Sequence, residues 1–99
     1  MAELKLLSAF FDAIHADPKV SSRHISLYMA ILKCYYNQEC KCPVHVYSYE
    51  LMPLAKISSS ATFHKTLREL DEYRYIRYVP SFDNRNRSRI FLTAIGVRK

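Results

Sequence analysis

A short run of hydroxylated and cationic side chains in the second half of the sequence has the composition of a site for anionic groups. Serine and threonine hydroxyls donate hydrogen bonds to phosphate oxygens, and lysine, arginine and histidine add donors that carry or can acquire positive charge. At helical spacing these side chains share one surface, because residues three and four apart are neighbours on a helix. The set comprises Ser59, Ser60, Thr62, His64, Lys65 and Arg68.

Three arginines form a second candidate site further along the chain. Arg85, Arg87 and Arg89 alternate with polar residues in a segment that also contains Asp83. A polar run between two β-forming segments is typical of a hairpin tip. Guanidinium groups on such a tip can follow phosphates or enter a narrow minor groove. The alternative interpretation is that these arginines only keep an exposed hairpin soluble.

The element that positions the first set is an amphipathic helix, predicted from about residue 59 to residue 73. Ser59 or Ser60 can cap its N-terminus, where free N–H groups and the positive end of the helix dipole favour anions. Capped amphipathic helices are also common in protein cores, so the helix alone does not indicate a function. We expect Phe63, Leu67 and Leu70 on its buried side, and Thr62, Lys65, Thr66 and Glu69 on the side that projects away.

Three helices and a brief strand are predicted before that helix. Apolar residues recur at helical spacing over residues 2–15 and again over residues 22–37. Residues 45–47 form the strand, and a short, proline-containing helix follows over about residues 49–56. Two further strands, residues 75–79 and 89–93, flank the arginine-rich tip. These elements predict a single small α+β domain.

The excess positive charge lies in the C-terminal part of the chain. The formal net charge is +6; residues 1–55 hold five Lys/Arg and five Asp/Glu, whereas residues 56–99 hold ten and four. A basic surface attracts phosphate polymers through counterion release. Charge alone would suit RNA, an anionic membrane or an acidic protein as well as DNA. It therefore indicates a class of partner.

Several classes of protein do not fit the sequence. No N-terminal signal-peptide pattern and no apolar run of membrane-spanning length are present, so we expect no membrane partner and a cytoplasmic location. The histidines do not cluster with a nucleophile, and neither a glycine-rich phosphate loop nor a pair of carboxylates is visible. We therefore expect no enzymatic activity and no cofactor.

The cysteines suggest two sites that we weigh and set aside. Cys34, Cys40 and Cys42 could join His45 in a zinc site, because thiolates and imidazole are the ligands zinc prefers. The C-x-C spacing lacks the usual two-residue gap, so we expect no metal. Redox sensing by Cys40 and Cys42 is a similar alternative. Free thiols in a reducing compartment are the preferred interpretation.

The tyrosines near the end of the predicted helix offer another nucleic-acid alternative. Tyr73, Tyr75 and Tyr78 are interleaved with Arg74 and Arg77, which is a pattern that can stack single-stranded bases. A two-stranded hairpin provides only a small platform for stacking. We therefore expect these tyrosines to pack against helices.

A motif in the second half of the sequence reads Ser59-x-x-Thr62-Phe63-x-Lys65-x-Leu67-x-Glu69-Leu70, then Tyr75-Ile76, Asp83-x-Arg85 and Leu92-Thr93-x-x-Gly96. This motif resembles the recognition helix and wing of bacterial winged-helix regulators, including the MarR type. A wider stretch runs from Ser22-Arg23-His24-Ile25-Ser26-Leu27-Tyr28 through Lys56-Ile57 to Ser60-Ala61-Thr62-Phe63-His64-Lys65. It is similar to small winged-helix proteins of bacterial mobile genetic elements, and the resemblance covers roughly residues 20–96.

The resemblance implies a winged helix-turn-helix fold in residues 19–99, with a three-helix core and a two-stranded β-wing, and an additional N-terminal helix in residues 1–18. Thr62, Lys65 and the neighbouring serines would then face DNA, and Arg85 and Arg87 would lie on the wing. The family usually has glycine where this sequence has Arg74, so we expect a strained cap or a different helix end there. The sequence also lacks the long C-terminal dimer helix of MarR proteins.

The helix, the hairpin and the charge distribution together predict a sequence-specific double-stranded DNA-binding protein. It would act as a regulator of transcription or as an accessory factor of a mobile element. Helix 59–73 would read the major groove, and the wing at residues 82–89 would contact the backbone or the minor groove.

The N-terminal helix suggests an alternative function. Its apolar side chains exceed what one neighbouring element needs, so the helix could dock onto a recombinase, replication or transcription protein. The same surface, residues 2–15, could form a homodimer that matches a palindromic DNA site. The side chains concerned are Leu4, Leu6, Leu7, Phe10, Phe11 and Ile14.

Overall fold

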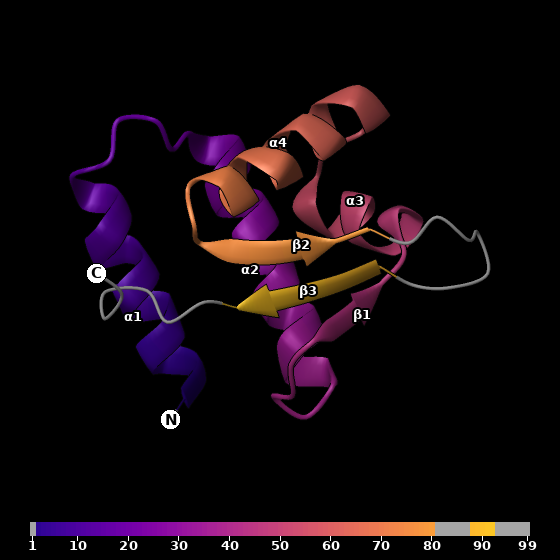
Figure 1. Ribbon diagram of the computed structural model, residues 1–99, viewed down its shortest axis with the longest axis horizontal. Helices are drawn as coiled ribbons and strands as arrows, with labels where there is room; N and C mark the ends of the chain where they lie inside the picture. The colour runs from indigo at the N-terminus through magenta and orange to yellow at the C-terminus, as the bar shows by residue number, and fades with distance from the viewer. Residues whose placement is uncertain (1, 81–87, 93–99) are drawn as a thin grey trace.

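The computed structural model describes residues 2–80 and 88–92, which form four helices and three strands (Figure 1). In chain order these are α1 (Ala2–His15), α2 (Ser22–Asn37), β1 (Val44–Val46), α3 (Ser48–Ala55), α4 (Ser60–Glu72), β2 (Ile76–Val79) and β3 (Ser88–Leu92). The chain has an α+β architecture, and the order of its elements is compatible with the expected winged-helix layout. None of the four described helices is both long and apolar enough to cross a lipid bilayer.

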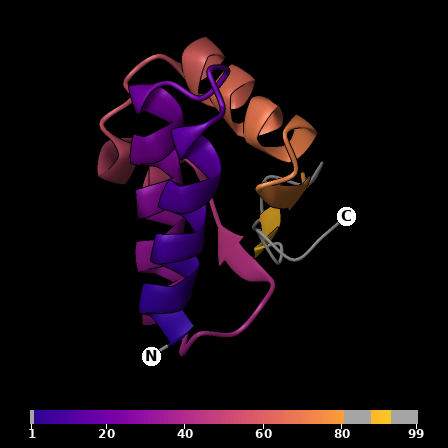
Figure 2. The same ribbon diagram turned by 90° about the vertical axis from the view of Figure 1, so that its left-hand side faces the viewer.

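The strands form one antiparallel sheet in the order β1-β3-β2. β3 lies in the middle, with Ile90 opposite Val44 of β1 and Tyr78 of β2. α2 and α3 lie behind the sheet in Figure 1, and the turned view in Figure 2 shows α2 to one side of the strands. Because side chains alternate along a strand, one face of the sheet packs on the helices and the other faces away from them.

The core is built around α2. Leu27, Tyr28 and Ile31 of this helix are completely buried. Phe10 of α1 is also completely buried, and its ring stacks on that of Tyr28 with the centroids 3.9 Å apart. Tyr75, just before β2, meets the same Phe10 ring edge-on at 5.4 Å. Aromatic contacts therefore connect α1 both to the central helix and to the sheet.

Three helix ends share a hydrogen-bond pattern that usually relies on glycine. After α4, the N–H of Tyr75 donates to the carbonyl of Leu70 and the N–H of Arg74 to that of Asp71, both at 3.0 Å. This pair of bonds is a Schellman motif, which requires positive φ at the residue after the cap. α2 and α3 end in the same way. The residues with positive φ at these helix ends are Glu39 at 62°, Cys40 at 57°, Lys56 at 61° and Arg74 at 71°.

Arg74 resolves the question that the sequence raised at this junction. The helix keeps the usual cap geometry, and arginine takes the left-handed conformation in place of glycine. The hydrophobic contact that accompanies a Schellman motif is also available, because Leu70 and Tyr75 are both buried.

The structure corrects the predicted sheet and one face of α4. The sheet has three strands rather than a two-stranded hairpin, because β1 pairs with β3 along Val44–Val46. Thr66 was expected to project away but is completely buried, since it lies three residues after Phe63 on the buried stripe. Its hydroxyl donates to the carbonyl of Thr62 at 2.8 Å, so burial leaves that hydroxyl satisfied. Glu69 is likewise turned inward, where it meets His24.

Arg74→Gly is expected to stabilise the fold, because glycine adopts positive φ without a Cβ clash. The free energy of unfolding should rise by about 1 kcal/mol. Urea unfolding measures the change. Arg68→Gly is the matched control, since Arg68 is exposed within α4 and glycine there should lower stability by about 1 kcal/mol. Equal losses at the two positions would contradict the assigned strain.

The hydroxyls of two buried tyrosines have different surroundings. The Tyr75 hydroxyl donates to Oδ2 of Asp17 at 2.6 Å, and this bond is the main cause of a lowered pKa at Asp17. The Tyr28 hydroxyl has no hydrogen-bond partner among the described residues, and burial raises its pKa. A charge-assisted hydrogen bond therefore stabilises the buried Tyr75. The Tyr28 hydroxyl loses its contact with water and gains no hydrogen bond from the described residues in return.

Tyr75→Phe should lower the free energy of unfolding by about 1 to 2 kcal/mol at neutral pH. Because folding lowers the pKa of Asp17, this stabilisation is fully present above the ordinary pKa of 3.8 and is lost as the pH falls through the lowered value. The difference between wild type and variant should therefore shrink in acid. Urea unfolding across the acid range provides the test, and a difference that grows in acid would refute the bond.

Tyr28→Phe is the matched control, because it removes a hydroxyl from the same core without removing a described bond. Stability should stay the same or rise, with no dependence on pH in the acid range. A loss as large as that of Tyr75→Phe would show that the Tyr28 hydroxyl does have a partner.

Candidate nucleic-acid interface

α4 has two faces of different character. Its inner face carries Phe63, Thr66, Leu67 and Leu70, all of which are buried. Ala61, Lys65 and Arg68 are exposed, and their spacing of four and three residues places them along one outer stripe. Neither Lys65 nor Arg68 forms a salt bridge with any described residue. The outer face therefore presents two cations that are not neutralised within the described part of the chain.

The first turn of α4 is fixed by its own side chains. The Oγ of Ser59 accepts a hydrogen bond from the N–H of Thr62 at 3.2 Å, which makes Ser59 the N-cap. His64 folds back so that its Nδ1 lies 2.9 Å from the carbonyl oxygen of Ser60. A carbonyl only accepts, so Nδ1 carries the proton and the neutral ring keeps Nε2 as an acceptor. Ser60 itself is exposed beside this turn.

A buried histidine couples α4 to the start of α2. The N–H of Ser21 donates to Nδ1 of His24 at 2.9 Å, so Nδ1 is an acceptor and the proton lies on Nε2. That Nε2 lies 2.8 Å from Oε1 of Glu69. The His24 side chain is only 3% exposed. This pair of bonds fixes the rotation of α4 about its axis, and hence which side chains face outward.

The structure brings together only part of the predicted site. The candidates Ser59, Ser60, Thr62, His64, Lys65 and Arg68 all belong to α4 or its cap. Arg85 and Arg87 lie outside the described residues. Arg89 belongs to β3, in agreement with the predicted strand over residues 89–93. It alternates with the buried Ile90, so it lies on the sheet face away from the helices.

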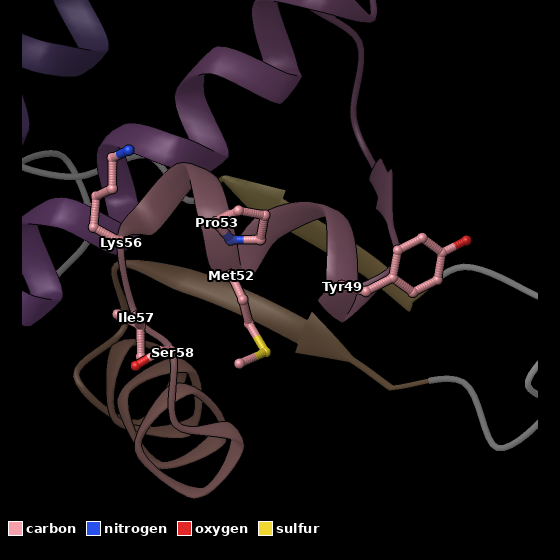
Figure 3. A pocket seen from close by; sticks show the side chains of 6 residues that line it. All are labelled: Tyr49, Met52, Pro53, Lys56, Ile57 and Ser58. Carbon is pink, nitrogen blue, oxygen red and sulfur yellow. The ribbon is translucent and has the colours of Figure 1, made fainter.

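An apolar pocket of about 600 Å³ lies beside the turn that leads into α4 (Figure 3). Lys56 and Tyr49 stand at opposite ends of the view, with Met52 between them. Lys56 is exposed and occupies the strained position of the α3 cap. Lys56 was not among the site residues predicted from the sequence. Its position directly before the tight turn that leads into α4 could have indicated a contact with an anion. The lining residues are Tyr49, Met52, Pro53, Lys56, Ile57 and Ser58.

The cysteines do not gather into a site within the described residues. Cys34 is buried in α2, Cys40 is half-buried and Cys42 is exposed, and none of the three is in a disulfide bond within the described residues. Burial raises the pKa of the Cys34 thiol, which disfavours the reactive thiolate. The described part of the chain contains no group of three or more His, Cys, Asp or Glu side chains that could hold a metal ion.

The tyrosines considered for base stacking do not share one exposed surface. Tyr75 is 3% exposed and packs on Phe10, and Tyr78 is half-buried. Tyr73 is also half-buried, with the ammonium of Lys19 5.3 Å from its ring centroid. The expectation that these rings pack within the fold is therefore confirmed for Tyr75 in particular.

The apolar stripe of α1 divides between core and surface. Phe10 is completely buried, whereas the adjacent Phe11 is 45% exposed. Leu7 and Ile14 are half-buried, and the side chains of Leu4 and Leu6 lie outside the described part of the chain. Much of the described apolar surface of α1 is thus used within the fold.

Comparison with models of protein families, with curated proteins and with solved structures finds no match.

Ser59→Ala should destabilise the start of α4, because it removes the acceptor for the N–H of Thr62. We expect the free energy of unfolding to fall by about 1 kcal/mol in urea unfolding. Ser60→Ala is the matched control. The Ser60 hydroxyl is exposed and accepts no hydrogen bond from a backbone N–H within the described residues. If both changes have the same effect, the cap is not at Ser59.

Proposed function

We propose that this chain is a winged-helix protein that binds double-stranded DNA and recognises its sequence with α4. The observation that carries the proposal is the division of α4 into a fully buried inner stripe and an exposed outer stripe with Lys65 and Arg68. A helix held in this way is rigid and still offers side chains to a groove.

The N-terminal half of α4 is the part suited to base edges. Ser59 accepts from Thr62 but keeps its own hydroxyl proton as a donor, and Ser60 is exposed beside it. The helix dipole adds a positive potential at the same end. Lys65 follows about one turn later and can reach a guanine or a phosphate, and Arg68 extends the stripe along the helix.

Backbone contacts on either side of α4 would orient it in the groove. Lys56 precedes α4 in an exposed turn, where its ammonium can reach a phosphate. Arg85 and Arg87 remain the candidates for the wing, between β2 and β3. Arg89 faces away from the helices, so we exclude it from the surface that includes Lys65. A role in transcription or in mobile-element maintenance is part of the same proposal.

The proposal predicts that Lys65→Ala weakens binding to a fluorescent DNA duplex. In an anisotropy titration at low salt, the dissociation constant should rise about 3- to 10-fold, and the slope of log K against log salt should fall by about 0.9. Arg68→Ala should act in the same direction. Binding by the wild type that is undetectable at low salt would reject the proposed function.

Lys33→Ala is the matched control for charge, because Lys33 is an exposed cation on α2, away from α4. Its affinity for the duplex should stay within about twofold of wild type. Selection from a random duplex pool then tests sequence recognition, and Thr62→Ala should alter the selected sequence. An equal loss of affinity in the Lys33 and Lys65 variants would mean that only net charge matters.

A further inference from the structure

The sheet has an outer face that no described element covers. Residues of β3 alternate, so Ser88, Ile90 and Leu92 point toward the helices and Arg89 and Phe91 point the other way. The register extends this outer face to both neighbouring strands. In Figures 1 and 2 the described helices lie on the other side of the sheet or at its margin. The outer-face residues are His45, Arg77, Val79, Arg89 and Phe91.

The charged side chains of this outer face, Arg77 and Arg89, are both cationic. Arg89 lies directly opposite His45 on one side and Val79 on the other, and Arg77 lies opposite Phe91. Arg77 is thus the diagonal neighbour of Arg89, at a Cα separation of about 7 to 8 Å. Arg77, Arg89 and His45 are exposed. An anion bound between Arg77 and Arg89 would lower the repulsion between their two guanidinium groups.

An aromatic ring lies among these cations. The guanidinium carbon of Arg77 is 5.8 Å from the centroid of the Phe91 ring, and Phe91 is half-buried. This contact holds the guanidinium over an apolar ring. Aromatic rings and guanidinium planes are the two surfaces on which proteins stack unpaired bases. The outer face thus combines sites for phosphates with a surface for a base.

The edges of the sheet are less suited to a partner than its outer face. The Gln38 side chain bonds to both the N–H and the carbonyl of His45, at 3.0 and 2.8 Å. On the other edge, Oδ2 of Asp71 accepts from the N–H of Tyr78 at 3.2 Å. These backbone groups are therefore already bonded, and an added β-strand would have to displace the side chains.

We propose that the outer face of the sheet binds single-stranded nucleic acid, with phosphates at Arg89 and at the edge of the Arg77 guanidinium, and a base stacked on the pair formed by that guanidinium and the Phe91 ring. This activity is separate from the duplex binding proposed for α4, because it uses different residues on a different element. An acidic peptide could form ion pairs with Arg77 and Arg89, but its carboxylates would not stack on the Phe91 ring and the Arg77 guanidinium. The ring and guanidinium pair favours a nucleic-acid strand.

The test uses the full chain and a fluorescent single-stranded DNA of mixed sequence in an anisotropy titration at low salt. Arg77→Ala and Arg89→Ala should each weaken binding about 3- to 10-fold and lower the salt slope by about 0.7. Phe91→Leu keeps an apolar side chain but removes the ring, and should weaken binding about fivefold or more with an unchanged salt slope. Lys33→Ala is the charge control and should bind like wild type.

Three results would overturn the proposal. One is that the wild type does not bind the single strand. Another is that Lys65→Ala abolishes binding while Arg77→Ala does not, which would place the strand on α4. The third is that a polyglutamate peptide binds as tightly as the DNA and neither ligand responds to Phe91→Leu, which would indicate an acidic protein partner. Circular dichroism of each variant checks the fold, and Arg77→Gln provides a second substitution at an exposed position.

The two DNA activities are separable in the same experiment. Arg77→Ala and Phe91→Leu should leave duplex affinity within about twofold of wild type, whereas Lys65→Ala should leave single-strand affinity unchanged to the same extent. A wild type that binds the duplex but not the single strand retains only the function of α4. A wild type that binds the single strand but not the duplex would support only the binding site on the outer face of the sheet.

Discussion

The turn between α4 and β2 joins three parts of the molecule. The N–H of Tyr75 donates to the carbonyl of Leu70, and this bond requires Arg74, between α4 and β2, to take the left-handed conformation. This geometry turns Tyr75 into the core, where it meets Phe10 of α1 and donates to Asp17. The same turn begins β2 at the next residue, so the sheet, α1 and α4 all depend on one strained position.

That constraint determines which surfaces remain for partners. One side of α4 is fully used by the core, and the bond between His24 and Glu69 prevents the helix from rotating. Lys65 and Arg68 are therefore held outward. In the same way, the buried Ile90 fixes the alternation of β3 and turns Arg89 to the opposite face. The outer face of α4 and the outer face of the sheet are thus two separate basic surfaces, each oriented by its own buried contacts. We therefore propose a separate ligand for each surface.

The sequence predicted the elements better than their pairing. Periodicity located α1 at its observed bounds, and the strands were displaced by about one residue, because local preference changes little at strand ends. Local patterns located a strand at residues 45–47, but its pairing with β3 depends on contacts distant in the chain and was therefore not revealed. Thr66 was misplaced because a hydroxyl satisfied by its own helix can be buried. The outer face of the sheet required the register, which single residues do not encode.

The central claim is that the exposed face of α4 binds duplex DNA. Nuclear magnetic resonance of the ¹⁵N-labelled chain tests it most directly, by following backbone amide shifts as an unlabelled duplex is added. If α4 binds the duplex, the largest changes are expected between Ser59 and Arg68, with small changes at Phe10 and Leu27 in the core. Changes confined to α1, or no changes at low salt, would contradict it.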